Sequence, residues 1–222
     1  MTSSDLLPKN EDVTLSCAFI PDADNRAGVL ALYAFLETLR DIPERVSDPL
    51  MGEIRLRWWY EAIEEIAAGR TPRYHPLTEA LQNLIAHYSL DPQAFYDLIE
   101  GQMPLLDKGP LTIKGALAVV DRGEVIVVHL ASQILGTDGM LISVARLYGL
   151  ARLKAQRGLS DAGDTELAHL LRDARTAAKA LPMALMPLAL PATLAPALWH
   201  GRPHGPLVKR FKLFWAFITG QI

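Results

Sequence analysis

Capped helical segments recur from one end of the chain to the other, and this pattern constrains the fold more than any other feature. Apolar residues repeat at helical spacing in these segments, whereas alternating β-branched runs bounded by turns are nearly absent. The chain has 222 residues, of which 50% are hydrophobic, so it is long enough for one sizeable core and short for two. The sequence therefore predicts an all-α protein with a single helical domain over residues 1–222.

Prolines and acidic caps set the expected helix boundaries. The first long helix is expected to begin after Asp22 or Asp24 and to stop near Asp41, because Pro43 cannot continue it. The next helix follows the cap at Asp48. Further helices are expected to start at Pro76 and Pro92 and to cover approximately 111–136, 139–157, 164–181 and 204–219. These segments predict a bundle of about eight or nine helices.

The apolar stretch from Lys179 to His200 is long enough to span a bilayer, yet its prolines argue against a straight spanning helix. Each proline removes a backbone donor and disfavours the helical conformation of the residue before it. The stretch therefore predicts a buried, broken helical segment.

Charge and cysteine content exclude several classes of protein. A net charge of -3 gives no broad attraction for nucleic acid, so any anion site must be local. A single cysteine, Cys17, cannot form an internal disulfide, and the N-terminus has no apolar signal-peptide core. We therefore expect no nucleic-acid partner and a cytoplasmic location, with attachment to a membrane surface as an open alternative.

The segment RAGVLALYAFLETLRDIPE, residues 26–44, resembles the opening of the squalene/phytoene synthases. In that family an arginine precedes a Leu-Tyr-Ala-Phe run that leads into an aspartate-rich motif, and Arg26 and Tyr33 keep this frame. The similarity continues more weakly through GEIRLRWWYEAI, FYDLIEGQ and HLASQILG. It implies an isoprenoid-synthase-like helical bundle with a central cavity. In active members, aspartate pairs on two facing helices hold Mg²⁺, which binds and ionises a prenyl diphosphate.

The first aspartate pair of the family falls on Arg40 and Glu44 in this chain, with Asp41 as the only aspartate kept between them. Glu37 and Asp41 are four residues apart and could form a displaced pair. The candidate metal ligands are therefore Glu37, Asp41 and Glu44. The same residues also fit a solvated, salt-bridged helix end.

The second aspartate pair is missing, because no carboxylate occurs from Leu141 to Ser160. The segment instead carries cations, which would repel a metal ion and attract a phosphate: Arg146, Arg152, Lys154 and Arg157. A tyrosine and an Ala-Gly pair of the family are also absent, with Val119, Glu124 and Val125 in their approximate places. No cofactor is expected, or Mg²⁺ if the chain is an active enzyme, and no catalytic residue can be assigned.

The resemblance implies a set of ligand-binding residues for an isoprenoid or lipid-like molecule, such as a prenyl diphosphate. The set comprises Arg26, Tyr33, Phe35, Asp41, Arg152 and Lys154. Core packing is the alternative for Tyr33 and Phe35, and Arg26 could instead extend to solvent.

Residues 204–222, HGPLVKRFKLFWAFITGQI, are basic and aromatic at once. This composition suits an interfacial helix on an anionic membrane, and it also suits a last helix that docks on the bundle.

Three functions remain open. The first is a degenerate family member that binds an isoprenoid or lipid and does not catalyse condensation. Within the family, its altered aspartate motif is similar to the branch that includes the mitochondrial complex I assembly factor, which implies a protein partner and a role in assembly at a membrane. The second is an active, Mg²⁺-dependent prenyltransferase that joins prenyl diphosphates head to head. The third is a helical scaffold without a ligand.

Overall fold

The computed structural model describes residues 7–137 and 139–222, and their regular structure is helical apart from one isolated bridge between Leu111 and Leu159. This confirms the all-α prediction. The α-helices are, in chain order, α1 Glu11–Cys17, α2 Ala23–Arg45, α3 Pro49–Ala67, α4 Pro76–Tyr88, α5 Pro92–Glu100, α6 Ile113–Val120, α7 Ile126–Ile134, α8 Ile142–Arg157, α9 Asp164–Ala178, α10 Met186–Ala189, α11 Ala195–Trp199 and α12 Pro206–Thr219.

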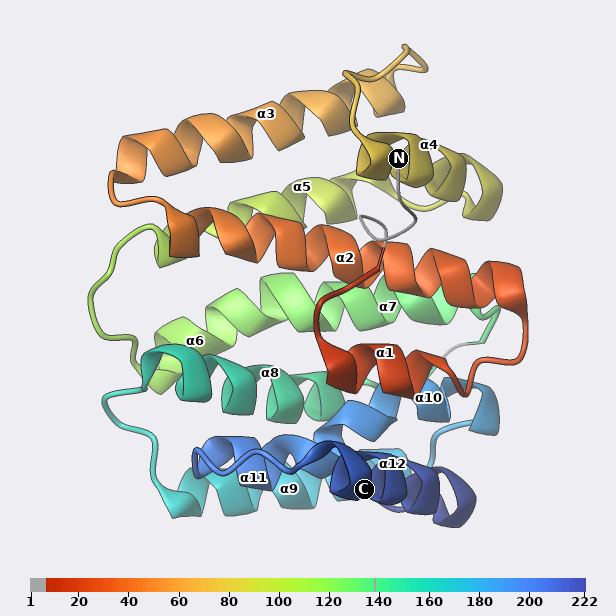
Figure 1. The fold of residues 1–222 in the computed structure, drawn as a ribbon, viewed down its shortest axis with the longest axis vertical. Helices are drawn as coiled ribbons and strands as arrows, with labels where there is room; N and C mark the ends of the chain where they lie inside the picture. The colour runs from red at the N-terminus through yellow and green to blue at the C-terminus, as the bar shows by residue number, and fades with distance from the viewer. Residues whose placement is uncertain (1–6, 138) are drawn as a thin grey trace.

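The helices form successive layers along the long axis of the molecule (Figure 1). Helices α3 and α4 lie at one end, and α9, α11 and α12 lie at the other. Helix α2 runs between them and packs against α3, α4, α7 and the short helix α1. Helix α8 lies further along and packs against α6, α9 and α11. The two long helices α2 and α8 therefore belong to different layers, and the candidate site lies between them.

Helix α2 begins as the sequence predicts and ends later. The Asp22 side chain accepts a hydrogen bond from the backbone N–H of Asn25, which caps the first turn. The helix then runs through Pro43 to Arg45, so the predicted end near Asp41 is wrong. Pro43 falls in the last turns, where it removes one backbone donor, and its own burial and that of Ile42 hold the turn in place.

The region predicted as one helix over 111–136 contains an irregular turn in its middle. Helices α6 and α7 are joined by the π-helical turn η3, Asp121–Val125. A π turn accommodates one extra residue and rotates the side chains that follow it. Glu124, at the fourth position of this turn, is buried in the protein interior.

The apolar stretch from Lys179 to His200 is a series of short helices, as predicted. It comprises η4 Met183–Leu185, α10, η5 Leu190–Leu194 and α11, and most of its apolar side chains are buried. Within the described residues, no helix combines the length and the hydrophobicity needed to cross a bilayer.

Candidate functional site

Four charged residues of α2 share one side of that helix and line a hollow of about 360 Å³ between α2 and α8. They are Glu37, Arg40, Asp41 and Glu44, at helical spacings of three and four residues that bring their side chains to one face. Helix α8 contributes Tyr148, Arg152 and Gln156 to the opposite wall. We refer to this hollow as the α2–α8 cleft.

A triad of two half-buried arginines and one buried glutamate connects the walls of the cleft. Arg40 of α2 forms an ion pair with Glu124 Oε2, and Arg152 Nε of α8 donates to Glu124 Oε1 over 3.1 Å. The carboxylate is 3% exposed, and each of its oxygens faces a guanidinium group. The π turn η3 supplies this carboxylate from a third element.

Helix α8 approaches the triad closely at Gly149. A Cβ atom at this position would lie 2.8 Å from Glu124 Cδ and 2.7 Å from Val120 Cγ1. Any larger side chain would therefore collide with the carboxylate or with α6.

The ionisation of the triad is set by burial and by its charges. Burial alone would raise the pKa of Glu124, but Arg40 and Arg152 outweigh it, so the pKa lies below the usual value of 4.5. Burial lowers the pKa of Arg40 to about 10, and Arg152 adds to this effect while Glu124 opposes it. Glu124 and Arg40 are therefore both charged near neutral pH, and the triad sets two arginines against one carboxylate.

The three candidate metal ligands each have partners within the protein. Glu37 accepts hydrogen bonds from the backbone N–H groups of Lys9, over 2.6 Å, and Asn10, over 3.1 Å. Asp41 binds Lys9 Nζ over 2.5 Å and the Arg45 guanidinium over 2.8 Å. Burial raises the pKa of Glu37, and the two backbone donors oppose this effect.

Glu44 binds the guanidinium of Arg157 over 3.1 Å. In residues 7–137 and 139–222, no group of three or more histidine, cysteine, aspartate or glutamate side chains is placed to hold a metal ion. The set of Glu37, Asp41 and Glu44 as metal ligands stays a prediction.

The segment before α1 covers one side of the cleft. Asn10 Nδ2 donates to the Tyr148 hydroxyl over 2.7 Å, and this hydroxyl donates to Asp12 Oδ2 over 3.3 Å. Asp12 also binds Lys209 Nζ of α12 over 2.6 Å. Burial raises the pKa of Tyr148 well above its usual range, so the hydroxyl keeps its proton. Hydrogen bonds and an ion pair therefore connect this side of the cleft to residues near both ends of the described chain.

The structure brings Asp41 and Arg152 together in the cleft and places the other predicted ligand-binding residues elsewhere. Arg26 donates to the Ile20 carbonyl over 2.7 Å. Arg26 lies 15 positions before Asp41, which is about 22 Å along a helix. Lys154 points away from the cleft, where its ammonium group donates to the Trp199 carbonyl over 2.8 Å.

Tyr33 and Phe35 are both buried. Burial raises the pKa of the Tyr33 hydroxyl well above its usual range, so this hydroxyl keeps its proton. Phe35 packs edge-on against Trp59 with ring centroids 5.4 Å apart, in the hydrophobic core.

A second hollow lies on a different side of α2, between α2 and α3. Its volume is about 940 Å³, and apolar side chains dominate its lining, including Ile42, Leu50, Ile54, Trp58 and Met103. We refer to it as the α2–α3 groove. Such a lining suits an apolar chain. The lining also includes the polar side chains Glu53, Arg55, Arg57, Glu61 and His75.

Sequence reasoning did not identify Glu124 as the counterion of the two arginines. The available signal was a carboxylate within the apolar run ALAVVDRGEVIVVHLA, because a buried charge requires a partner. Its place next to Arg40 and Arg152 depends on the π turn, which the sequence did not reveal.

The part of the chain that forms most of the cleft is similar in sequence to known proteins. The sequence model for squalene/phytoene synthase matches residues 8–152, which include the described cleft residues from Lys9 to Arg152. The human protein "NADH dehydrogenase (ubiquinone) complex I, assembly factor 6" is 25% identical over 133 residues, covering 60% of this chain and 40% of the human protein. The bovine protein of the same name is 24% identical over 133 residues, with the same shares covered. The chain thus matches about 40% of the length of these curated relatives. Since the family model matches well over half of its residues, this chain belongs to the squalene/phytoene synthase family.

Proposed function

We propose that this chain is a non-catalytic member of its family, which acts by binding in the manner of an assembly factor and does not transfer prenyl groups. The Arg40–Glu124–Arg152 triad carries this proposal. In active family members, carboxylates of two facing helices share magnesium ions with a diphosphate. In this chain the facing helices α2 and α8 present guanidinium groups to each other.

The donor set of the triad does not suit Mg²⁺. This ion requires near-octahedral oxygen coordination and shares its sites between carboxylates and phosphates. Both oxygens of Glu124 already face arginines, so the triad offers no free carboxylate oxygen. A guanidinium can neutralise a phosphate, but it does not polarise a leaving group as a metal ion does.

The proposed ligand is an isoprenoid or lipid-like molecule held in the α2–α3 groove. Its volume of about 940 Å³ and its apolar lining favour a hydrocarbon chain. Arg55 at the groove would bind a phosphate at the end of that chain, whereas Arg57 is already paired with Glu61 over 3.1 Å. The α2–α8 cleft supports such a ligand less well, because its cations Arg40 and Arg152 are already paired.

A turnover and binding assay tests the non-catalytic proposal. Purified protein is incubated with farnesyl or geranylgeranyl diphosphate, with and without Mg²⁺, and both diphosphate release and condensed product are measured. We expect no condensed product and an affinity that Mg²⁺ changes only slightly. Magnesium-dependent product that disappears in Asp41→Asn would instead establish the active prenyltransferase.

The same assay distinguishes a binding protein from a scaffold without a ligand. Binding of farnesyl diphosphate that is weakened by Ile54→Glu in the α2–α3 groove supports the proposed ligand. A matched change outside the groove, Ile142→Glu, replaces another exposed isoleucine and should leave the affinity unchanged. Absence of binding to the wild-type chain would favour the scaffold.

The assembly role is proposed from the relatives whose name gives that role. We propose that a membrane-bound NADH dehydrogenase complex is the client. The test is to delete the gene and to measure the amount of assembled complex on native gels. Wild-type protein and Asp41→Asn should both restore the complex, because the proposal assigns no chemistry to Asp41. Normal assembly after deletion would contradict the role.

A further inference from the structure

Helix α12 is only partly packed against the rest of the molecule. Its inner side carries Leu213 and Ala216, which are buried against Met186, Leu190 and Leu194 of the broken helical segment. Lys209, on the same side, binds Asp12. This settles one alternative from the sequence: the last helix docks on the bundle through one side.

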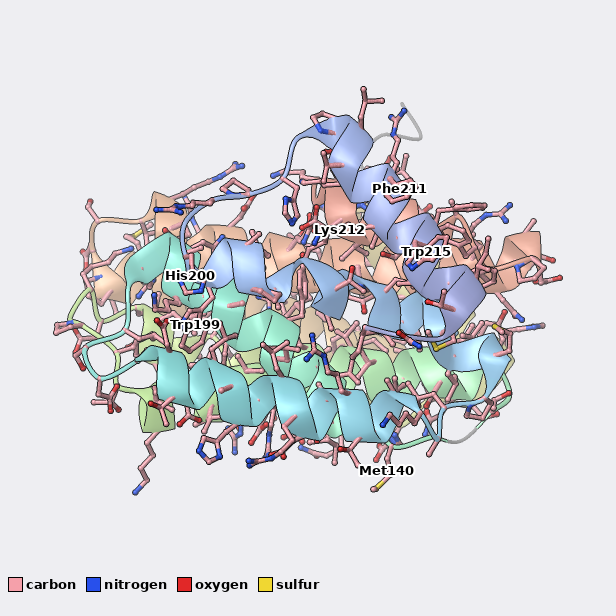
Figure 2. The ribbon with its side chains drawn as sticks, turned by 90° about the horizontal axis from the view of Figure 1, so that it is seen from below. Met140, Trp199, His200, Phe211, Lys212 and Trp215 are labelled. Carbon is pink, nitrogen blue, oxygen red and sulfur yellow. The ribbon has the colours of Figure 1, made fainter. Side chains whose placement is uncertain are left out.

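The outer side of α12 is a stripe of exposed apolar side chains. They are Leu207, Phe211, Phe214, Trp215 and Ile218, all more than half exposed. At 3.6 residues per turn these positions fall on one side of the helix, opposite Leu213 and Ala216. Figure 2 shows Phe211 and Trp215 along α12, at the outside of the molecule. A stripe of this kind marks an interaction surface.

Cations flank this stripe on both sides. The helical spacing places Arg210 on one flank and Lys212 on the other. Residues 201–222 contain no aspartate or glutamate. Neither Arg210 nor Lys212 forms an ion pair with the part of the chain that the structure describes. The charge pattern therefore complements an anionic surface that touches the whole stripe.

A cationic hollow of about 560 Å³ adjoins the Lys212 flank. Its lining combines Lys212 with His200, Arg202 and His204, together with Pro196 and Ala197. Figure 2 shows Lys212 on the side of α12 that faces the part of the chain carrying His200. A phosphate group would find several donors there, next to side chains that suit a hydrocarbon layer.

We propose that α12 attaches the protein to an anionic lipid bilayer, with its apolar stripe in the interface and lipid phosphates at Arg210, Lys212 and the adjoining hollow. The helix has 14 residues and is about 21 Å long, so it lies in the plane of the interface and does not cross the hydrocarbon core. Aromatic residues on one side and cations on the flanks are typical of such helices. This inference does not depend on the proposed assembly role.

A second copy of the chain fits this surface less well. Two stripes packed against each other would bring the flanking cations of both copies together. The segment has no acidic residue that would neutralise their charge. A bilayer that contains anionic lipids supplies the opposite charge along both flanks.

Flotation with vesicles tests the proposal. Vesicles of phosphatidylcholine alone are compared with vesicles that also contain phosphatidylserine. We expect binding to the anionic vesicles, weakened by salt, together with a blue shift of tryptophan emission that is lost in Trp215→Ser. The double variant Phe211→Ser/Trp215→Ser should bind at least about tenfold more weakly, because it removes two large apolar side chains from the contact. Arg210→Gln/Lys212→Gln should reduce binding to the anionic vesicles and should leave any binding to the neutral vesicles unchanged.

Matched controls separate a specific surface from a general loss of structure. Met140→Ser removes an exposed apolar side chain on a different part of the surface (Figure 2), and Lys114→Gln removes an exposed cation on α6; both should bind as wild type. Circular dichroism should show the same helix content in every variant. The proposal would be contradicted if the protein bound free inorganic phosphate but no vesicles. Equal binding to neutral and anionic vesicles would contradict it as well. Self-association that is lost in Phe211→Ser/Trp215→Ser, without vesicle binding, would assign the stripe to an interface between copies.

Discussion

Gly149 of α8 lies directly against Glu124, so closely that an added Cβ would stand 2.8 Å from the glutamate Cδ atom. Gly149→Ala should therefore force α8 or the π turn to move and should lower the free energy of unfolding by about 1–3 kcal/mol. Chemical denaturation followed by circular dichroism measures this effect. Gly115→Ala is the matched control, because Gly115 is also helical and a Cβ there meets only ordinary contacts at 3.5 Å and beyond. Equal effects of the two changes would contradict the close approach.

Removing the charge of Glu124 should be the most damaging single change in the cleft. In Glu124→Gln, the half-buried Arg40 and Arg152 would remain side by side without their counterion, at a cost of about 3–5 kcal/mol in unfolding free energy. The triple variant Arg40→Met/Glu124→Leu/Arg152→Met removes all three charges and should recover much of that loss. Equilibrium denaturation measures both, and a triple variant less stable than Glu124→Gln would show that the ion pairs themselves stabilise the fold.

The contribution of Glu124 should depend on pH in a defined direction. Burial raises its pKa, but Arg40 and Arg152 lower it further, so the folded pKa lies below the usual 4.5. The ionised carboxylate therefore favours folding above about pH 4.5, and this contribution is lost as the pH falls through the folded pKa. The stability difference between wild type and Glu124→Gln should be constant near neutral pH and should shrink in acid.

Glu37 provides the opposite case for the same titration. Burial raises the pKa of its carboxyl, so the folded state favours the protonated form and the wild type should gain stability relative to Glu37→Gln as the pH falls. Thermal unfolding midpoints are measured across the acid range for wild type, Glu124→Gln and Glu37→Gln. The difference between wild type and each variant, plotted against pH, should have opposite slopes for the two variants. Slopes of the same sign would mean that the two carboxylates do not experience the environments described above.

Two neighbouring residues of α12 should respond very differently to truncation. Leu213 is 1% exposed and Phe214 is 51% exposed. Leu213→Ala should cost about 2–5 kcal/mol, because it leaves a cavity against Leu190 and Leu194. Phe214→Ala should change stability by about 0.5 kcal/mol or less, as for other surface positions. Comparable losses would place Phe214 in a contact that the described fold does not contain.

Periodicity and caps were sufficient to predict the helical class and most helix positions, because these signals are local. Asp22, for example, caps α2 as expected. The passage of α2 through Pro43 was not predictable locally, since burial of that turn decides it. The buried, broken segment from Lys179 to His200 was predictable because each proline acts on its immediate neighbours.

The candidate site was predictable only in part, because sequence patterns are local and the site depends on contacts between distant segments. The sequence showed that an arginine stands in the first aspartate motif and that Arg152 lies in the second. It did not show that both contact one carboxylate, because that contact joins three elements through a π turn. Lys9 and Asn10 were also missed, since their hydrogen bonds to Glu37 depend on a chain path that no local pattern encodes.

The broken segment that contains α10 and α11 has a consequence for the order in which the protein folds. Isolated helices of four and five residues are not stable in water, because nucleation costs more than so few backbone bonds return. Helix α11 packs against α8, so this segment can become helical only after α8 has formed. Helix α12 packs against η5, so α12 can dock only after η5 has formed. Amides of the segment should therefore exchange with solvent hydrogen through cooperative opening of this whole unit, and not through fraying of separate helices.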